Sequence, residues 1–179
     1  MRDGDSFDFE LAHNNEREAR TRDQLTRILQ THDVSRWVRT RRIRIEEQAI
    51  PHSHPVLTLN TRHRDDDGQL LSTFLHEQIH WIVSERHAET RQATGELRKA
   101  YPGVEAGFPE WAADRESSYL HLVVNYLELV AMEEVAGAAE AARVFDLWLT
   151  DHYTALYRIV LNDRVGISEI VARHGLMLA

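Results

Sequence analysis

The strongest constraint in the sequence is a segment, residues 70–83, in which apolar residues recur with the period of an α-helix. His76, Glu77 and His80 interrupt this pattern as His-Glu-x-x-His. Residues four apart share one face of a helix, so the two imidazoles can bind one metal ion. Glu77 lies beside the first histidine, where a carboxylate can act as a general base on a water molecule at the metal. We therefore expect a buried helix over residues 69–87 that carries a metal site.

The composition limits how such a site is built. The chain has 179 residues, which suits one domain, so we expect residues 1–179 to form a single domain. It contains 11 histidines and no cysteine, which excludes disulfides, thiolate catalysis and cysteine-bound metals. A metal must therefore be held by His, Asp or Glu. We expect one Zn²⁺ ion, and such ligands also accept other divalent metals.

Charge and hydropathy narrow the choice of partners. The net charge of −8 provides no general attraction to nucleic acid or to anionic membranes. The acidic N-terminal sequence is not followed by the apolar segment of a secretory signal. The longest apolar stretch, residues 120–132, is too short and too polar to span a membrane. We expect a cytoplasmic protein that acts on a peptide or protein, with neither a membrane nor a nucleic acid as its partner.

The order of the expected elements predicts the fold class. An amphipathic helix over residues 15–30 precedes one or two half-exposed strands over 37–45 and a short strand over 54–61. The remainder is helical, with expected helices over residues 69–87, 89–100, 114–135, 138–161 and 168–174. An N-terminal helix and a short sheet, followed by a helical bundle, predict an α+β fold with the strands segregated from the helices.

The His-Glu-x-x-His helix and the strand before it resemble the zincin metallopeptidases over residues 54–83. In that superfamily the helix supplies two zinc ligands and the catalytic glutamate, and the preceding strand lines the substrate cleft. The motif HEQ-x-HW, followed later by YLHLVVNYLE, is also similar to a group of small uncharacterised bacterial proteins. The resemblance implies a small zincin-like domain that hydrolyses peptide bonds with Glu77 as the general base.

The third metal ligand has to come from outside the motif. The longer metzincin pattern requires glycine and histidine where this chain has Val83 and Arg86. In the gluzincins a later helix supplies a glutamate, and the resemblance therefore favours Glu128 as the third ligand.

Two further polar residues share the face of Glu128 on the helix over residues 114–135, namely His121 and Asn125. With Glu128 as ligand, His121 becomes a catalytic hydrogen-bond donor beside the substrate. The alternative makes His121 the ligand and lets Asn125 orient a histidine of the motif. A hydrogen-bond network without a metal would also satisfy these buried groups.

His152 and Tyr153, expected in the middle of the helix over residues 138–161, are further catalytic candidates. Zincins use a His or Tyr donor to stabilise the oxyanion of the tetrahedral intermediate. The structural alternative for this pair is a partly buried aromatic face.

Two other functions are open on the sequence. The same fold can hold a metal without catalysis, as a regulatory or structural module. A nucleic acid can bind the arginine-rich stretch 36–44, but no base-stacking surface of interleaved aromatics accompanies it. We favour a solvated strand face for its arginines, Arg36, Arg39, Arg41, Arg42 and Arg44.

Overall fold

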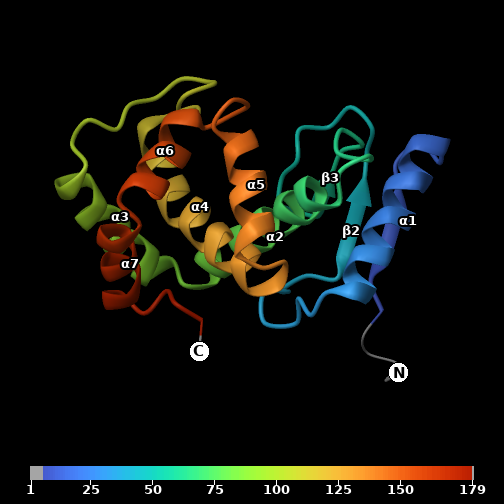
Figure 1. The fold of residues 1–179 in the computed structure, drawn as a ribbon, viewed down its shortest axis with the longest axis horizontal. Helices are drawn as coiled ribbons and strands as arrows, with labels where there is room; N and C mark the ends of the chain where they lie inside the picture. The colour runs from blue at the N-terminus through green and yellow to red at the C-terminus, as the bar shows by residue number, and fades with distance from the viewer. Residues whose placement is uncertain (1–5, 179) are drawn as a thin grey trace. The chain divides into compact units, whose positions relative to one another are not determined.

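The computed structural model describes residues 6–178, which form seven helices and one three-stranded sheet (Figure 1). This part of the chain is α+β and mostly helical, as the sequence predicts. It divides into two compact units inside helix α2 (Asp67–Glu85), with Trp81 ending the first and Ile82 beginning the second. Within residues 6–178, no helix has both the length and the apolar character needed to cross a membrane. The first five residues of the acidic N-terminal sequence lie outside the described range.

The sheet of the first unit is parallel and has the order β1-β2-β3. Its strands are β1 (Asp8–Leu11), β2 (Arg42–Ile45) and β3 (Leu57–Leu59). Helix α1 (Glu16–Thr31) lies between β1 and β2 in the chain, because parallel neighbours need a crossover connection. The register aligns apolar residues across the sheet in two rows, Phe9 with Ile43 and Leu57, and Leu11 with Ile45 and Leu59.

The strand predictions hold only in part. Strand β2 occupies only the end of the expected stretch 37–45. Trp37 lies instead in a turn, where its side chain is fully buried and its backbone N–H donates to the Val34 carbonyl. Strand β1 was not expected, because its alternating acidic residues resemble a solvated segment. Its Glu10 accepts a hydrogen bond from Arg44 of β2 at 3.1 Å, and this cross-strand ion pair compensates the charge on the exposed face.

Glu18 joins the start of α1 to the end of β2. Its carboxylate is fully buried and accepts hydrogen bonds from the backbone N–H groups of His13 at 2.8 Å and Glu47 at 3.2 Å. The His13 ring adds a third contact at 2.8 Å. Burial raises the pKa of this carboxyl, but the hydrogen bonds outweigh burial and hold the pKa below its usual value.

The second unit is built around α4 (Arg115–Val135), which contacts each of the other four helices of the unit (Figure 1). These are α3 (His87–Ala100), α5 (Ala138–Trp148), α6 (Thr154–Asn162) and α7 (Arg164–Arg173). Asp114 caps α4 by accepting a hydrogen bond from the Ser117 N–H at 2.8 Å. Because it is surrounded, α4 buries residues on every face, including polar ones.

The single helix expected over residues 138–161 is wrong, because α5 and α6 are separate helices. Tyr153 adopts a left-handed conformation with φ of 51° just before α6. The first N–H groups of α6, from Thr154 and Ala155, donate to the carbonyls of Pro109 and Glu110 at 3.2 and 3.1 Å. These contacts with a distant loop satisfy a helix start that the local periodicity does not reveal.

Removing the Glu18 charge tests the junction between α1 and β2. We expect Glu18→Ala to lower the free energy of unfolding by about 2 kcal/mol, because two buried N–H donors lose their acceptor. Wild-type stability should also fall as pH drops from about 5 through the lowered pKa of Glu18, where the folded state must take up a proton. Glu18→Gln should show a weaker acid dependence. Urea unfolding between pH 3 and 7 measures both effects.

Glu16→Gln is the matched control, since Glu16 lies in the same turn but is exposed and pairs with Arg20. It should change stability by less than about 0.5 kcal/mol. Equal losses in the Glu16 and Glu18 variants would contradict the role given to the buried carboxylate.

Candidate metal centre

Helix α2 is held in place through the central residue of its motif. The amide of Gln78 is fully buried, and its Oε1 accepts from the N–H groups of Arg39 at 2.7 Å and Thr40 at 3.0 Å. Its Nε2 donates to the Thr40 carbonyl at 2.7 Å. The residue between Glu77 and Ile79 therefore fixes the rotation of α2 about its own axis, and with it the direction of the neighbouring histidines.

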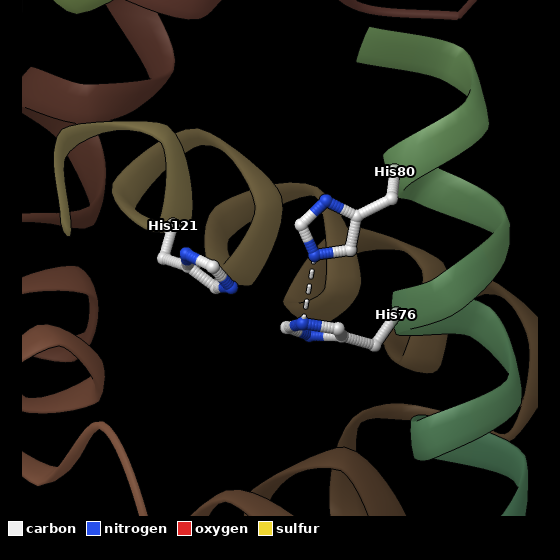
Figure 2. Close-up of side chains that lie close together, drawn as sticks. All are labelled: His76, His80 and His121. Carbon is white, nitrogen blue, oxygen red and sulfur yellow. Dashed lines mark hydrogen bonds between the residues drawn. The ribbon is translucent and has the colours of Figure 1, made fainter. Parts of the chain in front are cut away.

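Three histidines converge in Figure 2: His76 and His80 from α2, and His121 from α4. One ring nitrogen from each lies within 4.8 Å of the others. His76 and His121 are each 8% exposed, and His80 is half-buried. The expected pairing of the two motif histidines on one helix face is therefore present, and a third imidazole joins them.

The tautomer of His121 follows from its backbone contact. Its Nδ1 lies 2.7 Å from the carbonyl oxygen of Ser117, one turn earlier on α4. A carbonyl only accepts, so Nδ1 carries the hydrogen and the neutral ring keeps the lone pair of Nε2 for a metal. A backbone carbonyl that orients the ring in this way is typical of a metal-binding histidine.

The spacing of the motif histidines also fits a metal. Their Nε2 atoms lie 3.2 Å apart (Figure 2). Two nitrogens bound at the usual 2.0–2.1 Å to one tetrahedral zinc ion are separated by roughly 3.3 Å. Three imidazoles suit Zn²⁺ and several other transition metals, so the donor set fits a divalent ion without fixing its identity.

Glu77 is the neighbour of His76 in the sequence. It follows His76 on α2 and is only 5% exposed, so its carboxylate is withdrawn from bulk water. A buried carboxylate that follows a metal-binding histidine in the chain is a chemically suitable proton acceptor.

Glu128, the favoured third ligand on the sequence, is not brought into the histidine cluster found among residues 6–178. It is 1% exposed and accepts a hydrogen bond from the Tyr157 hydroxyl at 2.9 Å. Tyr157 is fully buried on α6 and supplies the partner that a buried carboxylate requires. The geometry therefore favours the alternative assignment, with His121 as the ligand.

His152 and Tyr153 lie at the turn between α5 and α6, not in the middle of a helix. The Tyr153 ring packs against the His121 ring with centroids 4.4 Å apart, so it is adjacent to the histidine cluster. The Nδ1 of His152 lies 2.6 Å from the Asp151 carboxylate, and the His152 and Tyr153 rings are 5.0 Å apart. Sequence reasoning selected the pair but missed the partner Asp151, whose signal is its position directly before His152.

Asn125 does not orient a histidine, because neither end of its amide has a hydrogen-bond partner. That part of the alternative assignment is wrong.

The loop before β3 supplies a contact that the sequence did not predict. His54 stacks on Trp81 at 4.0 Å, and the Trp81 indole donates to the Ser53 carbonyl at 3.0 Å. This contact ties the loop to the residue that follows His80.

The arginine-rich stretch is largely engaged within the chain. Arg42 and Arg44 pair with Glu10 at 3.5 and 3.1 Å. Arg36 and Arg41 lie over the rings of Trp37 and Phe7, at 5.7 and 5.2 Å from the ring centroids. Arg39 donates to the carbonyl of Arg36 at 3.0 Å. Each of the five arginines therefore has a contact within the chain, and no nucleic acid is needed to explain why these arginines are present.

No protein-family model, no curated protein and no solved structure matches this chain. Its function has to be argued from the residues of the site.

Substitution of the two rival ligands separates the assignments. We expect His121→Ala to weaken Zn²⁺ binding by more than about 100-fold, beyond the loss usual for a group that only orients a ligand. Glu128→Gln should bind Zn²⁺ within about 10-fold of wild type, because the amide oxygen can still accept from Tyr157. Competition with a chromophoric zinc chelator measures both affinities, and thermal unfolding reports whether each variant is folded. The opposite ranking would restore Glu128 as the ligand.

Proposed function

We propose that this protein is a zinc-dependent metallopeptidase with a His₃ site formed by His76, His80 and His121. The observation that carries the proposal is the convergence of these three imidazoles, and the buried Glu77 follows the first of them in the chain. The resemblance of the His-Glu-x-x-His helix to zincins supports hydrolysis of a peptide bond. The assignment of His121 as a ligand replaces the catalytic donor role that the sequence favoured for it.

The chemistry divides between the metal and the side chains. When bound, Zn²⁺ supplies a Lewis acid that acidifies water and polarises the substrate carbonyl. Glu77 accepts a proton from the attacking water and then delivers it to the nitrogen of the departing amine. Its burial suits this transfer, because few solvent molecules compete for the proton.

His152 and Tyr153 are the candidates for stabilising the oxyanion. Tyr153 contacts the ring of His121, and His152 is oriented by Asp151 at 2.6 Å. The Asp151 carboxylate accepts from Nδ1–H, so the neutral ring carries a lone pair at Nε2, and His152 could donate to an oxyanion only as an imidazolium. The two residues are adjacent, so one turn of the chain supplies both candidate donors.

A metal-binding module without catalysis is the rival function. It would use the same three histidines and would need no general base. The role of Glu77 therefore separates the two functions, because a structural site gains nothing from a buried carboxylate that is not a ligand.

Glu77→Gln tests the proposed mechanism. We expect the variant to bind Zn²⁺ with nearly wild-type affinity and to lose about 10²- to 10⁴-fold in kcat, because the amide cannot accept the proton. Mass spectrometry of a diverse peptide library, incubated with the zinc-loaded protein, identifies a substrate and gives the rates.

Glu85→Gln is the control, since Glu85 is an exposed carboxylate at the end of the same helix. It should leave the rate unchanged. Full activity in Glu77→Gln would refute the mechanism, and a zinc-loaded wild type that cleaves none of the library peptides would favour the module.

A further inference from the structure

Phe108 is an aromatic residue that the proposed mechanism does not use. It lies in the loop between α3 and α4 and is 61% exposed. Within residues 6–178, it is the only aromatic residue among the exposed large apolar ones. A single exposed apolar side chain is ordinary on a protein surface, so the surroundings of Phe108 decide whether it has a role.

The Phe108 ring is the outer end of a row of aromatic rings that leads to the histidine cluster. Its centroid lies 5.6 Å from that of Tyr153, and the Tyr153 centroid lies 4.4 Å from that of His121. The Phe108 ring is therefore no more than about 10 Å from the ring of a proposed metal ligand. Tyr153 between them is only half-buried, so the row remains accessible from the exposed Phe108 inward.

The loop that carries Phe108 is held on both sides of it, and it passes the start of α6 (Figure 1). Before Phe108, the N–H of Gly107 donates to the Ala112 carbonyl at 2.8 Å. Gly107 has a φ of 118°, which side chains rarely allow, so the turn requires glycine. After Phe108, the Pro109 carbonyl accepts from the N–H of Thr154 at 3.2 Å. Because the loop is already fixed, a ligand that contacts the ring has little loop entropy to remove.

Tyr153 is held in a conformation that is unfavourable for a tyrosine. Its φ of 51° lies in the left-handed region, which residues other than glycine, asparagine and aspartate seldom adopt. Such residues are concentrated at functional sites, where the surrounding structure maintains them. The strain falls on the residue that joins Phe108 to His121, which indicates that the position of its ring matters.

The place of this surface identifies what it can bind. A peptide with its scissile carbonyl at the metal extends by about 3.3–3.6 Å per residue, so about three residues span the distance to Phe108. A phenyl ring offers neither charge nor a hydrogen bond, and it pairs well with another aromatic ring. We propose that Phe108, together with Tyr153, contacts an aromatic side chain of the substrate within three residues of the cleaved bond, and so determines specificity. This proposal rests on the His₃ peptidase site proposed above.

Cobalt-loaded protein and hydroxamates test this contact without an activity assay. Co²⁺ bound by the three histidines gives a visible spectrum, and its change on adding a hydroxamate gives the affinity for that hydroxamate. Phenylalkyl hydroxamates with one to four methylene groups place a ring at increasing distance from the metal. We expect wild type to bind the best of them at least about 10-fold more tightly than the alkyl hydroxamate with the same methylene groups and no ring.

Substitution of Phe108 assigns this ring preference. Phe108→Ala should reduce the preference to about 2-fold or less and should bind Co²⁺ and acetohydroxamate as wild type does, because a methyl group is too short to reach Phe108. Phe108→Tyr keeps the ring and should keep the preference. If Phe108→Ala does not fold, Phe108→Gln is measured with the same expectations.

Val165→Ala is the matched control, since Val165 is an apolar residue of the same unit that is 70% exposed on α7. It should leave the ring preference and both other affinities unchanged. In the peptide library, cleaved peptides should carry an aromatic residue at one fixed position within three residues of the cleaved bond, and Phe108→Ala should remove that enrichment.

The outcomes separate the two proposals. Wild-type protein that fails to bind Co²⁺ would overturn the His₃ site and the role of Phe108 together. If wild type binds Co²⁺ but shows no ring preference at any length, or if Phe108→Ala keeps the preference, only the role of Phe108 is overturned. Loss of the preference in Val165→Ala, or loss of Co²⁺ from a folded Phe108 variant, would also overturn it, because the effect would then not be specific to a contact between rings.

Discussion

The structure depends on burying polar side chains along two helices that are otherwise apolar. Helix α2 buries His76, Glu77 and Gln78 in succession, and α4 buries polar groups on one face. Each buried polar atom requires a partner, or it reduces stability by a kcal/mol or more, on the order of a tenth of the stability of a small domain. Gln78 finds its partners in the backbone before β2, and Glu128 finds one in Tyr157. These hydrogen bonds hold α2 and α4 in place, and the other buried polar side chains of the two helices are positioned with them.

The sequence predicted the helices better than the strands, and the reason is physical. Helix α4 begins within a residue of its expected start and ends where expected, because its apolar period is long and Asp114 caps it. Strand β1 has four residues, and its pairing with β2 depends on contacts across more than thirty residues of chain. The break before α6 depends on carbonyls from residues 109 and 110. Local patterns do not contain such contacts.

The candidate site shows the same limit. Spacing alone placed His76 and His80 together, because both belong to one helix. Spacing also grouped His121, Asn125 and Glu128 on one face, but it could not tell which of them meets the motif. That choice depends on where the partners of each residue lie. Tyr157 stands 29 residues beyond Glu128 in the chain and donates to its carboxylate, whereas the Ser117 carbonyl holds the hydrogen of the neutral His121 ring on Nδ1.

The choice of ligand has an electrostatic consequence. Three neutral imidazoles leave the whole charge of a divalent ion in the site, whereas a glutamate ligand would cancel half of it. In the proposed site Glu77, which follows His76 in the chain, would face a more strongly positive centre, and a positive field favours the carboxylate form that accepts a proton. With His121 as a ligand, the carboxylate that balances the ion would also be the one that performs the proton transfer in the proposed reaction.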